Sequence, residues 1–378
     1  MGHFRKQQIT IFPTNTCNLQ CVYCVAAKSK SQVNKNVIDI NFAKRGIYDY
    51  FSDKSKHQIR FYSNGEPTNE ISIIKECISY AKGLIEERKS NNIQTEELIS
   101  EIQTNCYFDE ETAIWIAKNI NYVWVSIDGW ADIQNRYRKS KDNSNSADII
   151  LNNLKKIIEI KKSDSQVDSF VGVRITIVNE TVDKQIELVE YFKDLGITEI
   201  CSEPCFKPVD SLGVNGKITL VDIKEYVYNF YEAWKRANEL GVNYINSFIV
   251  NFDEKVTYAC RTCLPTPHLT VDGYVSSCDL GFHGKTNLSS LLFGKYNNNT
   301  KSIEYCDTAI SKLQSRNCSN IPACKNCDIK EYCGGGCLGR AYHETNDFYG
   351  VIDEYCWAIK YLYNKMKLSN ITIKHLHP

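Results

Sequence analysis

The sequence has no excess of charge of either sign, because 45 basic residues balance 45 acidic ones in a chain of 378. A protein whose main partner is a nucleic acid usually carries a net positive charge and a basic face. The sequence also has no run of about 18 consecutive apolar residues, the length that spans a membrane. We therefore expect neither a nucleic acid nor a membrane as a partner.

The N-terminus lacks a secretory signal as well. Its first residues, MGHFRKQQITIF, contain no apolar core of about 7–15 residues. The chain has neither an internal repeat nor a low-complexity tail, and we expect a soluble, cytoplasmic protein. Its 17 cysteines are unusual for that compartment, where thiols stay reduced. They therefore indicate metal binding rather than disulfides.

Short apolar runs alternate with longer helical patterns over the first 210 residues, which is typical of βα units around a parallel sheet. We predict an α/β fold, a partial (β/α)6 barrel of the TIM type, with function at the carboxyl ends of the strands. Gly196 suits the end of the last helix. The predicted strands are Gln8–Phe12, Gln58–Tyr62, Leu98–Thr104, Tyr122–Ile127, Val171–Val178 and Thr198–Ser202. The predicted helices are Asn41–Phe51, Ile71–Glu87, Glu110–Asn119, Ser146–Lys161 and Val182–Leu195.

Three regions follow from this reading: the barrel at 1–210, a bridging helix and strand region at 211–257, and a small cysteine-rich domain at 258–378. In the bridge, Gly213–Lys217 is a predicted loop and Thr219–Leu240 a predicted amphipathic helix. The last region holds ten of the 17 cysteines and too little periodic apolar pattern for a core of its own. We expect bound metal to stabilise it.

Cys17, Cys21 and Cys24 follow the first predicted strand with the spacing C-x3-C-x2-C. A zinc site usually takes four ligands, often as two C-x2-C pairs. Three thiolates on one loop can instead hold three corners of a cubane iron–sulfur cluster and leave the fourth iron open. The triplet by itself is compatible with either metal.

The triplet resembles the motif of the radical S-adenosylmethionine (SAM) superfamily, which has an aromatic residue before its third cysteine. Further along, "NGEP" resembles that family's Gly-Gly-Glu-Pro, which binds the amino group of SAM, and Cys106 replaces the glycine of its Thr-Asn-Gly turn. In the family's peptide-modifying branch, a serine and an arginine hold the carboxylate of SAM, and Arg136 competes with Arg138 for the second role. The resemblance implies these SAM-binding residues: Tyr23, Asn64, Gly65, Glu66, Pro67, Thr104, Asn105, Ser126, Asp128, Arg138 and Asn179.

The cysteines after residue 258 resemble the SPASM signature, with Gly273 as its glycine. The C-x2-C spacings alone also fit a pair of zinc ribbons. The resemblance implies two auxiliary [4Fe–4S] clusters, and so three clusters in all, with SAM bound at the first. One set of ligands is Cys260, Cys263, Cys278 and Cys337, and the other is Cys324, Cys327, Cys333 and Cys356. Cys318 lies close enough in sequence to replace a ligand of the second set.

The resemblance implies an enzyme that cleaves SAM to a 5′-deoxyadenosyl radical, which then takes a hydrogen atom from a substrate. We expect a maturase that modifies a ribosomal peptide or protein by a thioether, a C–C crosslink or an oxidation. Three alternatives remain open: a Cys or Ser dehydrogenase of the anaerobic sulfatase-maturing type (formylglycine formation), a small-molecule dehydrogenase, and a zinc-binding scaffold without catalysis.

Two carboxylates are candidate catalytic residues. Asp279 follows Cys278, where sulfatase-maturing enzymes carry a proposed base, and Glu203 follows the sixth predicted strand. Each also fits a structural role, because acidic residues are common beside metal ligands and in turns. The expected partners are the peptide substrate and an electron donor such as flavodoxin or ferredoxin. Because the barrel begins at residue 7, we expect a leader to be bound by a separate leader-recognition protein or by another surface, or the substrate to have no leader.

Overall fold

The computed structural model describes residues 8–26, 36–62, 64–163, 169–206, 218–248, 252, 254–285 and 288–369. The strands are β1 (Ile9–Ile11), β2 (Gln58–Phe61), β3 (Ile99–Thr104), β4 (Tyr122–Ser126), β5 (Phe170–Ile177), β6 (Glu199–Pro204), β7 (Asn243–Ile245), β8 (His268–Leu269), β9 (Tyr274–Ser276), β10 (Leu292–Asn297) and β11 (Ser302–Tyr305). The helices are α1 (Ile40–Phe51), α2 (Ile71–Ser90), α3 (Glu110–Asn119), α4 (Ala131–Tyr137), α5 (Ala147–Ser163), α6 (Gln185–Asp194), α7 (Ile223–Glu239), α8 (Asp307–Ser315), α9 (Lys330–Cys333), α10 (Leu338–Thr345) and α11 (Asp353–Leu368).

The strands form one sheet in the order β11-β10-β9-β8-β1-β2-β3-β4-β5-β6-β7. Strands β1 to β6 are parallel neighbours in chain order, which confirms the predicted partial barrel, and their ends lie within two residues of the predicted ones. Strand β7 extends the parallel part beyond β6, and β8 pairs in parallel with β1 on the other side. Strands β9 to β11 continue from β8 as antiparallel neighbours.

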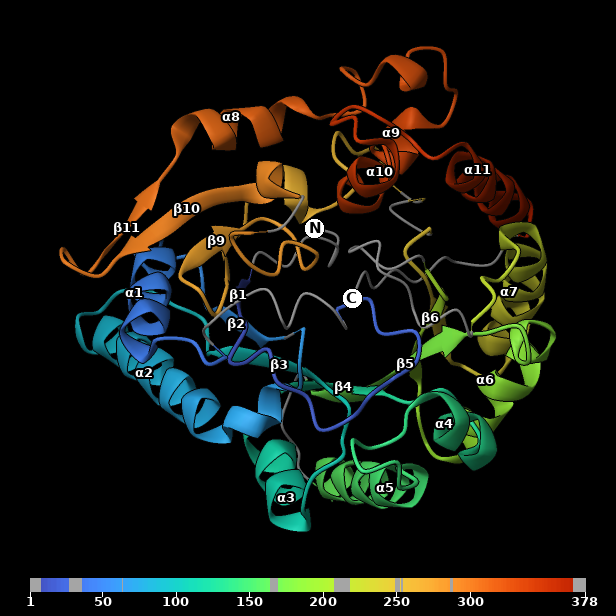
Figure 1. The fold of residues 1–378 in the computed structure, drawn as a ribbon, viewed down its shortest axis with the longest axis horizontal. Coiled ribbons are helices and arrows are strands. Elements are labelled where there is room, and N and C mark those ends of the chain that lie inside the picture. The colour runs from blue at the N-terminus through green and yellow to red at the C-terminus, as the bar shows by residue number, and fades with distance from the viewer. Residues whose placement is uncertain are drawn as a thin grey trace.

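The central strands are apolar because they are covered on both faces. In β4, the first four residues, Tyr-Val-Trp-Val, are all buried, as expected for a parallel strand between helices and a packed interior. Helices α1 to α7 follow the outside of the curved sheet (Figure 1). Helix α1 shows how they attach: its Asp39 cap begins the helix, and Phe42, Ile47 and Phe51 are buried on its inner face.

The C-terminal region lies across the open side of the barrel, between the first and last parts of the parallel sheet (Figure 1). Helix α11 contacts α7, and β11 contacts α1. Because β8 pairs with β1, the predicted domain boundary at residue 258 is crossed by a continuous sheet. The cysteine-rich region therefore shares its main-chain hydrogen bonding with the barrel.

The sequence prediction missed the short helix α4. The helical pattern Val182–Leu195 begins as a 3-10 turn at Val182–Lys184 and becomes α6 only at Gln185. Gly196 ends that helix with φ of 88°, as predicted. The predicted loop Gly213–Lys217 lies outside the described residues. Within the described part of the chain, no helix combines the length and the apolar character that crossing a membrane requires.

Candidate active site

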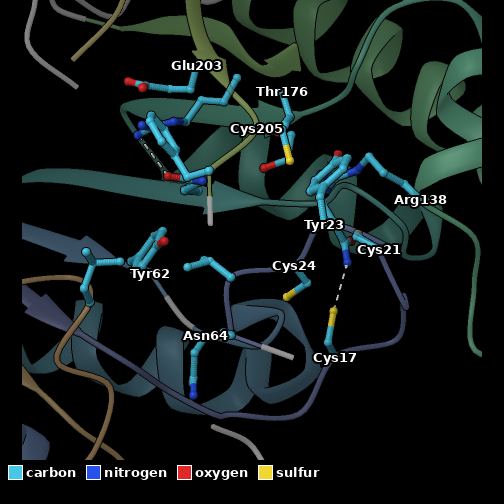
Figure 2. A pocket seen from close by; sticks show the side chains of 18 of the residues that line it. Cys17, Cys21, Tyr23, Cys24, Tyr62, Asn64, Arg138, Thr176, Glu203 and Cys205 are labelled. Carbon is cyan, nitrogen blue, oxygen red and sulfur yellow. Dashed lines mark hydrogen bonds between the residues drawn. The ribbon is translucent and has the colours of Figure 1, made fainter. Parts of the chain in front are cut away.

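A cavity of about 310 Å³ opens at the carboxyl ends of the parallel strands. This volume lies in the range typical of small-molecule sites. Figure 2 shows Cys17, Cys21 and Cys24 together on one side of the cavity and Glu203 on the opposite side. Eight of the eleven predicted SAM contacts belong to its lining, and they are Tyr23, Asn64, Gly65, Glu66, Thr104, Asn105, Ser126 and Arg138.

The cysteine loop is held by main-chain bonds to the segment after α4. The amide of Gln20 donates to the carbonyl of Lys139 at 2.8 Å, and that of Val22 donates to the carbonyl of Tyr137 at 2.9 Å. The Cys17 sulfur accepts from the Leu19 amide at 3.4 Å. N–H groups aimed at a sulfur favour its thiolate form, which is the form that binds metal.

Gly65 lies directly against the cysteine loop. A Cβ atom on Gly65 would lie 2.0 Å from the carbonyl oxygen of Thr16, so only glycine fits. The next residue, Glu66, donates its amide to that same oxygen at 2.7 Å. The resemblance to Gly-Gly-Glu-Pro thus coincides with a steric requirement of this chain.

The Glu66 carboxylate joins the ends of β2 and β3. It is buried and accepts from the Thr104 hydroxyl at 2.7 Å, the Asn105 amide at 2.7 Å, and the amide and hydroxyl of Thr68 at 3.1 and 2.8 Å. Burial raises the pKa of Glu66, and these hydrogen bonds oppose the rise. Pro67 begins the turn that Glu66 caps and is not part of the cavity lining.

Tyr23, Asp128 and Arg138 form a buried network behind the cysteines. The Tyr23 hydroxyl donates to the Asp128 carboxylate and accepts from an Arg138 guanidinium N–H at 2.9 Å. Burial raises the pKa of Asp128, while Arg138 opposes that shift. Asp128 is therefore a support for Tyr23 and Arg138 rather than a residue of the cavity wall.

Of the two competing arginines, Arg138 lies at the cavity. It is 7% exposed, and its Nε has no hydrogen-bond partner among the described residues. A buried donor without a partner is costly, and a ligand carboxylate would satisfy it. Arg136 is on the surface, where it pairs with Glu180 at 3.4 Å.

The structure departs from the prediction for Asn179, which is exposed in the turn after β5 and does not line the cavity. Arg174 and Thr176, both within β5, take that part of the wall. The strand alternates: Val173, Ile175 and Ile177 are buried, so the intervening positions point the other way. Two polar residues at alternate positions of an apolar strand were a signal that the sequence analysis did not use.

Glu203 belongs to the cavity wall and is held in an ion pair. Arg340 of α10 lies 3.3 Å from its carboxylate, and the amide and hydroxyl of Ser247 donate to it at 2.8 and 2.9 Å. The Arg340 guanidinium also lies over the Phe206 ring. Further along α10, His343 and Glu344 line the same wall. Residues of α10 were absent from the predicted site, because only the tertiary fold brings this helix to the cavity.

Asp279 is not among the residues that line the cavity, although the neighbouring Leu280 is. Its two carboxylate oxygens accept from one Arg60 nitrogen at 2.9 Å each, and His268 lies at 3.1 Å. Burial alone would raise the pKa of Asp279, but Arg60 and His268 hold it well below its usual range. A carboxylate paired in this way is stabilised in its charged form, which fits a structural role, and the role of Asp279 as a base stays a prediction.

The eight predicted auxiliary ligands lie in two neighbourhoods. Burial is the largest cause of the raised pKa of Cys260, Cys263 and Cys278. The next cause that raises it is the charge of Cys337 for Cys260 and Cys278, and the charge of Cys260 for Cys263. In the other neighbourhood, Cys356 and Cys327 raise the pKa of Cys324, and Cys356 and Cys324 raise that of Cys333. The same two groups are the predicted ligand sets, and their binding of clusters stays a prediction.

Burial raises the pKa of Cys21, Cys263 and Cys333 to about 12. Such thiols lose their protons near neutral pH only when a metal replaces them, so the donor set fits metal sites. Within the described ranges, no three His, Cys, Asp or Glu side chains converge tightly enough to hold a single ion. A cubane differs from one ion in that it spreads its thiolates over separate corners.

The remaining cysteines differ in their surroundings. Cys318 is buried next to the second set, where its charge adds to the raised pKa of Cys324. Cys205 lines the cavity, and Cys306 is exposed. Cys77 and Cys106 are buried within the hydrophobic core, and Cys201 is buried beside Arg174. Of the aromatic residues, Tyr62 lines the cavity, while Tyr107 and Trp130 pack against the core.

Comparison with known proteins agrees with this geometry. Residues 11–192 match the family described as the radical SAM superfamily. Over 375 residues, the chain is 21% identical to a cysteine-type anaerobic sulfatase-maturating enzyme of Clostridium novyi, covering 95% of this chain and 94% of that enzyme.

Solved structures show the same fold. The structure described as hexahistidine-tagged anSMEcpe with bound AdoMet has a TM-score of 0.72 and 18% identity, covering 96% of this chain and 95% of that one. Streptococcus suis SuiB bound to its precursor peptide SuiA has a TM-score of 0.63 and 16% identity, covering 93% of this chain and 76% of SuiB.

Proposed function

From a radical SAM domain at residues 11–192 in a chain that resembles anaerobic sulfatase-maturating enzymes along 95% of its length, we propose a peptide-modifying maturase. The observation that carries the proposal is the cavity itself. Three cysteines of one loop face it on one side, and a wall of charged side chains from β5, β6 and α10 faces it on the other. The volume of the cavity is in the range of sites that bind one small molecule, which supports a bound cofactor.

The proposed cofactors are SAM and three [4Fe–4S] clusters. Cys17, Cys21 and Cys24 would hold the first cluster. The two neighbourhoods of cysteines would hold the auxiliary clusters, with four thiolates each. The cluster on the cysteine loop, when bound, supplies one electron for the cleavage of SAM to a 5′-deoxyadenosyl radical.

The chain's own residues position SAM and keep the site dry. Arg138 offers its Nε to the SAM carboxylate, with Ser126 on the same wall. Glu66 fixes the loops after β2 and β3, and its contact with the SAM amino group stays a prediction. The buried Tyr23–Asp128 pair holds Arg138 in place and excludes water from behind the cysteines.

A peptide substrate is supported by the charged wall and by the relatives. The anSMEcpe structures include one with bound Cp18Cys peptide, and SuiB is bound to SuiA. Arg340 and Glu203 present donors and acceptors of the kind that recognise polar groups of a peptide. We propose a cytoplasmic enzyme that receives electrons from a flavodoxin or ferredoxin. For substrates that carry a leader, we propose that a separate leader-recognition protein binds the leader.

A second candidate is oxidation of a Cys or Ser in a sulfatase-type sequence to formylglycine. The similarity to the Clostridium novyi enzyme over nearly the whole chain favours it. Asp279, paired with Arg60, and Glu203, which lines the cavity and is paired with Arg340, are the two candidate acids or bases.

The test is release of 5′-deoxyadenosine from SAM by anaerobically reconstituted protein, with and without peptides. Cysteine-containing precursor and sulfatase-type peptides should raise the release above the background, and mass spectrometry of the peptide then names the reaction. The triple variant Cys17→Ala, Cys21→Ala, Cys24→Ala should release none. No stimulation by any peptide would contradict a peptide substrate, and release by the triple variant would contradict the cofactor site.

A further inference from the structure

Arg316 is a buried cation without an acidic partner. It is 1% exposed, and its three guanidinium nitrogens donate to main-chain carbonyls: Nε to Phe348 at 2.9 Å, and the two others to Gly336 at 3.4 Å and Gly350 at 3.0 Å. The guanidinium also forms a hydrogen bond with the Cys263 thiol. No carboxylate of the described residues forms an ion pair with it. Burying an unpaired charge is very unfavourable, so a negative group should lie nearby.

The other fully buried arginine shows what is missing. Arg60 is also 1% exposed, but it pairs with Glu101 at 3.1 Å and with Asp279 at 2.9 Å. At Arg60, two carboxylates therefore neutralise the buried guanidinium, and no further anion is needed there. Around Arg316, the candidate anions are cysteines.

Arg316 lies between the two ligand sets. It donates to Gly336, which stands in the loop that joins Cys333 of the second set to Cys337 of the first. Burial raises the pKa of Cys260 and Cys263, and Arg316 opposes that rise at both thiols. It likewise opposes the rise at Cys324 and Cys356 of the second set.

We propose that Arg316 is the shared counterion of the two cysteine sets and stabilises the reduced, more negative state of the clusters that they bind. This rests on the auxiliary clusters of the proposed function, but not on the substrate. Reduction adds one electron to a cluster and no proton, so its charge falls by one. A fixed positive charge in a poorly screened interior favours that change. Arg316 does not line the cavity and is a tuning residue rather than a catalytic one.

The experiment measures the reduction potentials of the auxiliary clusters. All variants are made in a protein that carries Cys17→Ala, Cys21→Ala and Cys24→Ala, so that only the auxiliary clusters remain. The clusters are titrated with dithionite, and their reduction is followed by electron paramagnetic resonance. In Arg316→Met, we expect both clusters to be at least tenfold harder to reduce, a shift of about 59 mV for one electron. Arg316→Lys keeps the charge and should shift by less than half as much.

The control is Lys325→Met, which removes an exposed charge between two ligands of the second set, Cys324 and Cys327. Because water screens an exposed charge, its effect should be smaller than that of Arg316→Met. Loss of iron in the Met variant with retention in the Lys variant would also support a need for the charge.

Several results would overturn the proposal. They are unchanged potentials in Arg316→Met, equal shifts or equal iron loss in the Met and Lys variants, and a shift confined to one of the two clusters. Zinc in place of iron in the parent variant would overturn the proposal together with the auxiliary clusters. A failure of peptides to stimulate SAM cleavage would leave these potentials unaffected, so the two proposals fail separately.

Discussion

Gly65 has no room for a side chain. In Gly65→Ala, the new Cβ would overlap the Thr16 carbonyl at 2.0 Å, and the cysteine loop would have to move. We expect a loss of roughly 2 kcal/mol in the free energy of unfolding, with loss of the cluster bound to that loop. Iron analysis and thermal denaturation measure both effects.

The matched control for this substitution is Gly83→Ala on the exposed face of α2, where no atom lies within 4 Å of the new Cβ. It should be stabilising by about 0.5–1 kcal/mol, because alanine favours helix. Full iron content in Gly65→Ala would show that the loop tolerates the displacement.

Arg138 and Arg136 are two residues apart, but only the first is at the cavity. Arg138→Lys keeps a positive charge beside Asp128 and removes the Nε donor. We expect the KM for SAM to rise roughly tenfold or more, as for loss of a hydrogen bond to a charged group. Arg136→Lys, at an exposed pair with Glu180, should leave that KM unchanged. Equal effects of the two variants would refute the assignment.

At the scale of elements, α10 connects Cys337, a proposed auxiliary ligand, to the cavity. The helix starts directly after Cys337, and its Arg340, His343 and Glu344 line the cavity wall. Binding of Cys337 to its cluster should therefore set the position of that wall.

In Cys337→Ser, we expect the iron content to fall by roughly a third, one of three clusters. Peptide-stimulated turnover should fall more than the cleavage of SAM without peptide. Cys306→Ser is the matched control, because Cys306 is exposed and belongs to neither set. If peptide stimulated Cys337→Ser as strongly as the unaltered protein, the position of α10 at the cavity would not depend on the cluster.

Element prediction succeeded where periodicity was strong. The strands β1 to β6 and helices α1, α2, α3 and α5 follow from alternating apolar and helical patterns. Helix α4 was missed because its seven residues give too few turns for an apolar face. In addition, one of its buried positions is held by a polar residue, Gln134. Strand β8 was missed because two residues carry no pattern, and only pairing with β1 makes them a strand.

At the scale of the whole molecule, we expect the C-terminal region to depend on bound metal more than the barrel does. The described residues after 254 contain short strands and, apart from α11, short helices around the eight buried or half-buried thiols of the predicted ligands. Thiols with pKa values raised to about 12 would be protonated and neutral without metal, and the region would lose its cross-links.

Removal of iron by a chelator should therefore raise amide hydrogen exchange across residues 254–369, with much smaller changes in β2 to β6. Hydrogen exchange with mass spectrometry measures this difference. Because β8 joins β1, we expect that strand to be the last of the region to lose protection. Uniform protection of both parts after removal of iron would show that the region has a sufficient core of its own.

The sequence by itself indicated a radical SAM domain and metal-binding cysteines, because ligand spacing along a chain is a local property. The cysteine triplet, the Gly-Glu-Pro turn and the two sets of C-terminal cysteines are readable as residue types at fixed intervals. Only the tertiary structure decided which charged side chains face the cavity and which are paired with other charges elsewhere. Asp279 and Glu203 looked alike in the sequence, yet one is clamped by Arg60 while the other lines the cavity, and Arg316 meets both cysteine sets only after the chain has folded. The reason is physical: the electrostatic environment of a side chain is set by segments distant in sequence, and no local pattern records it.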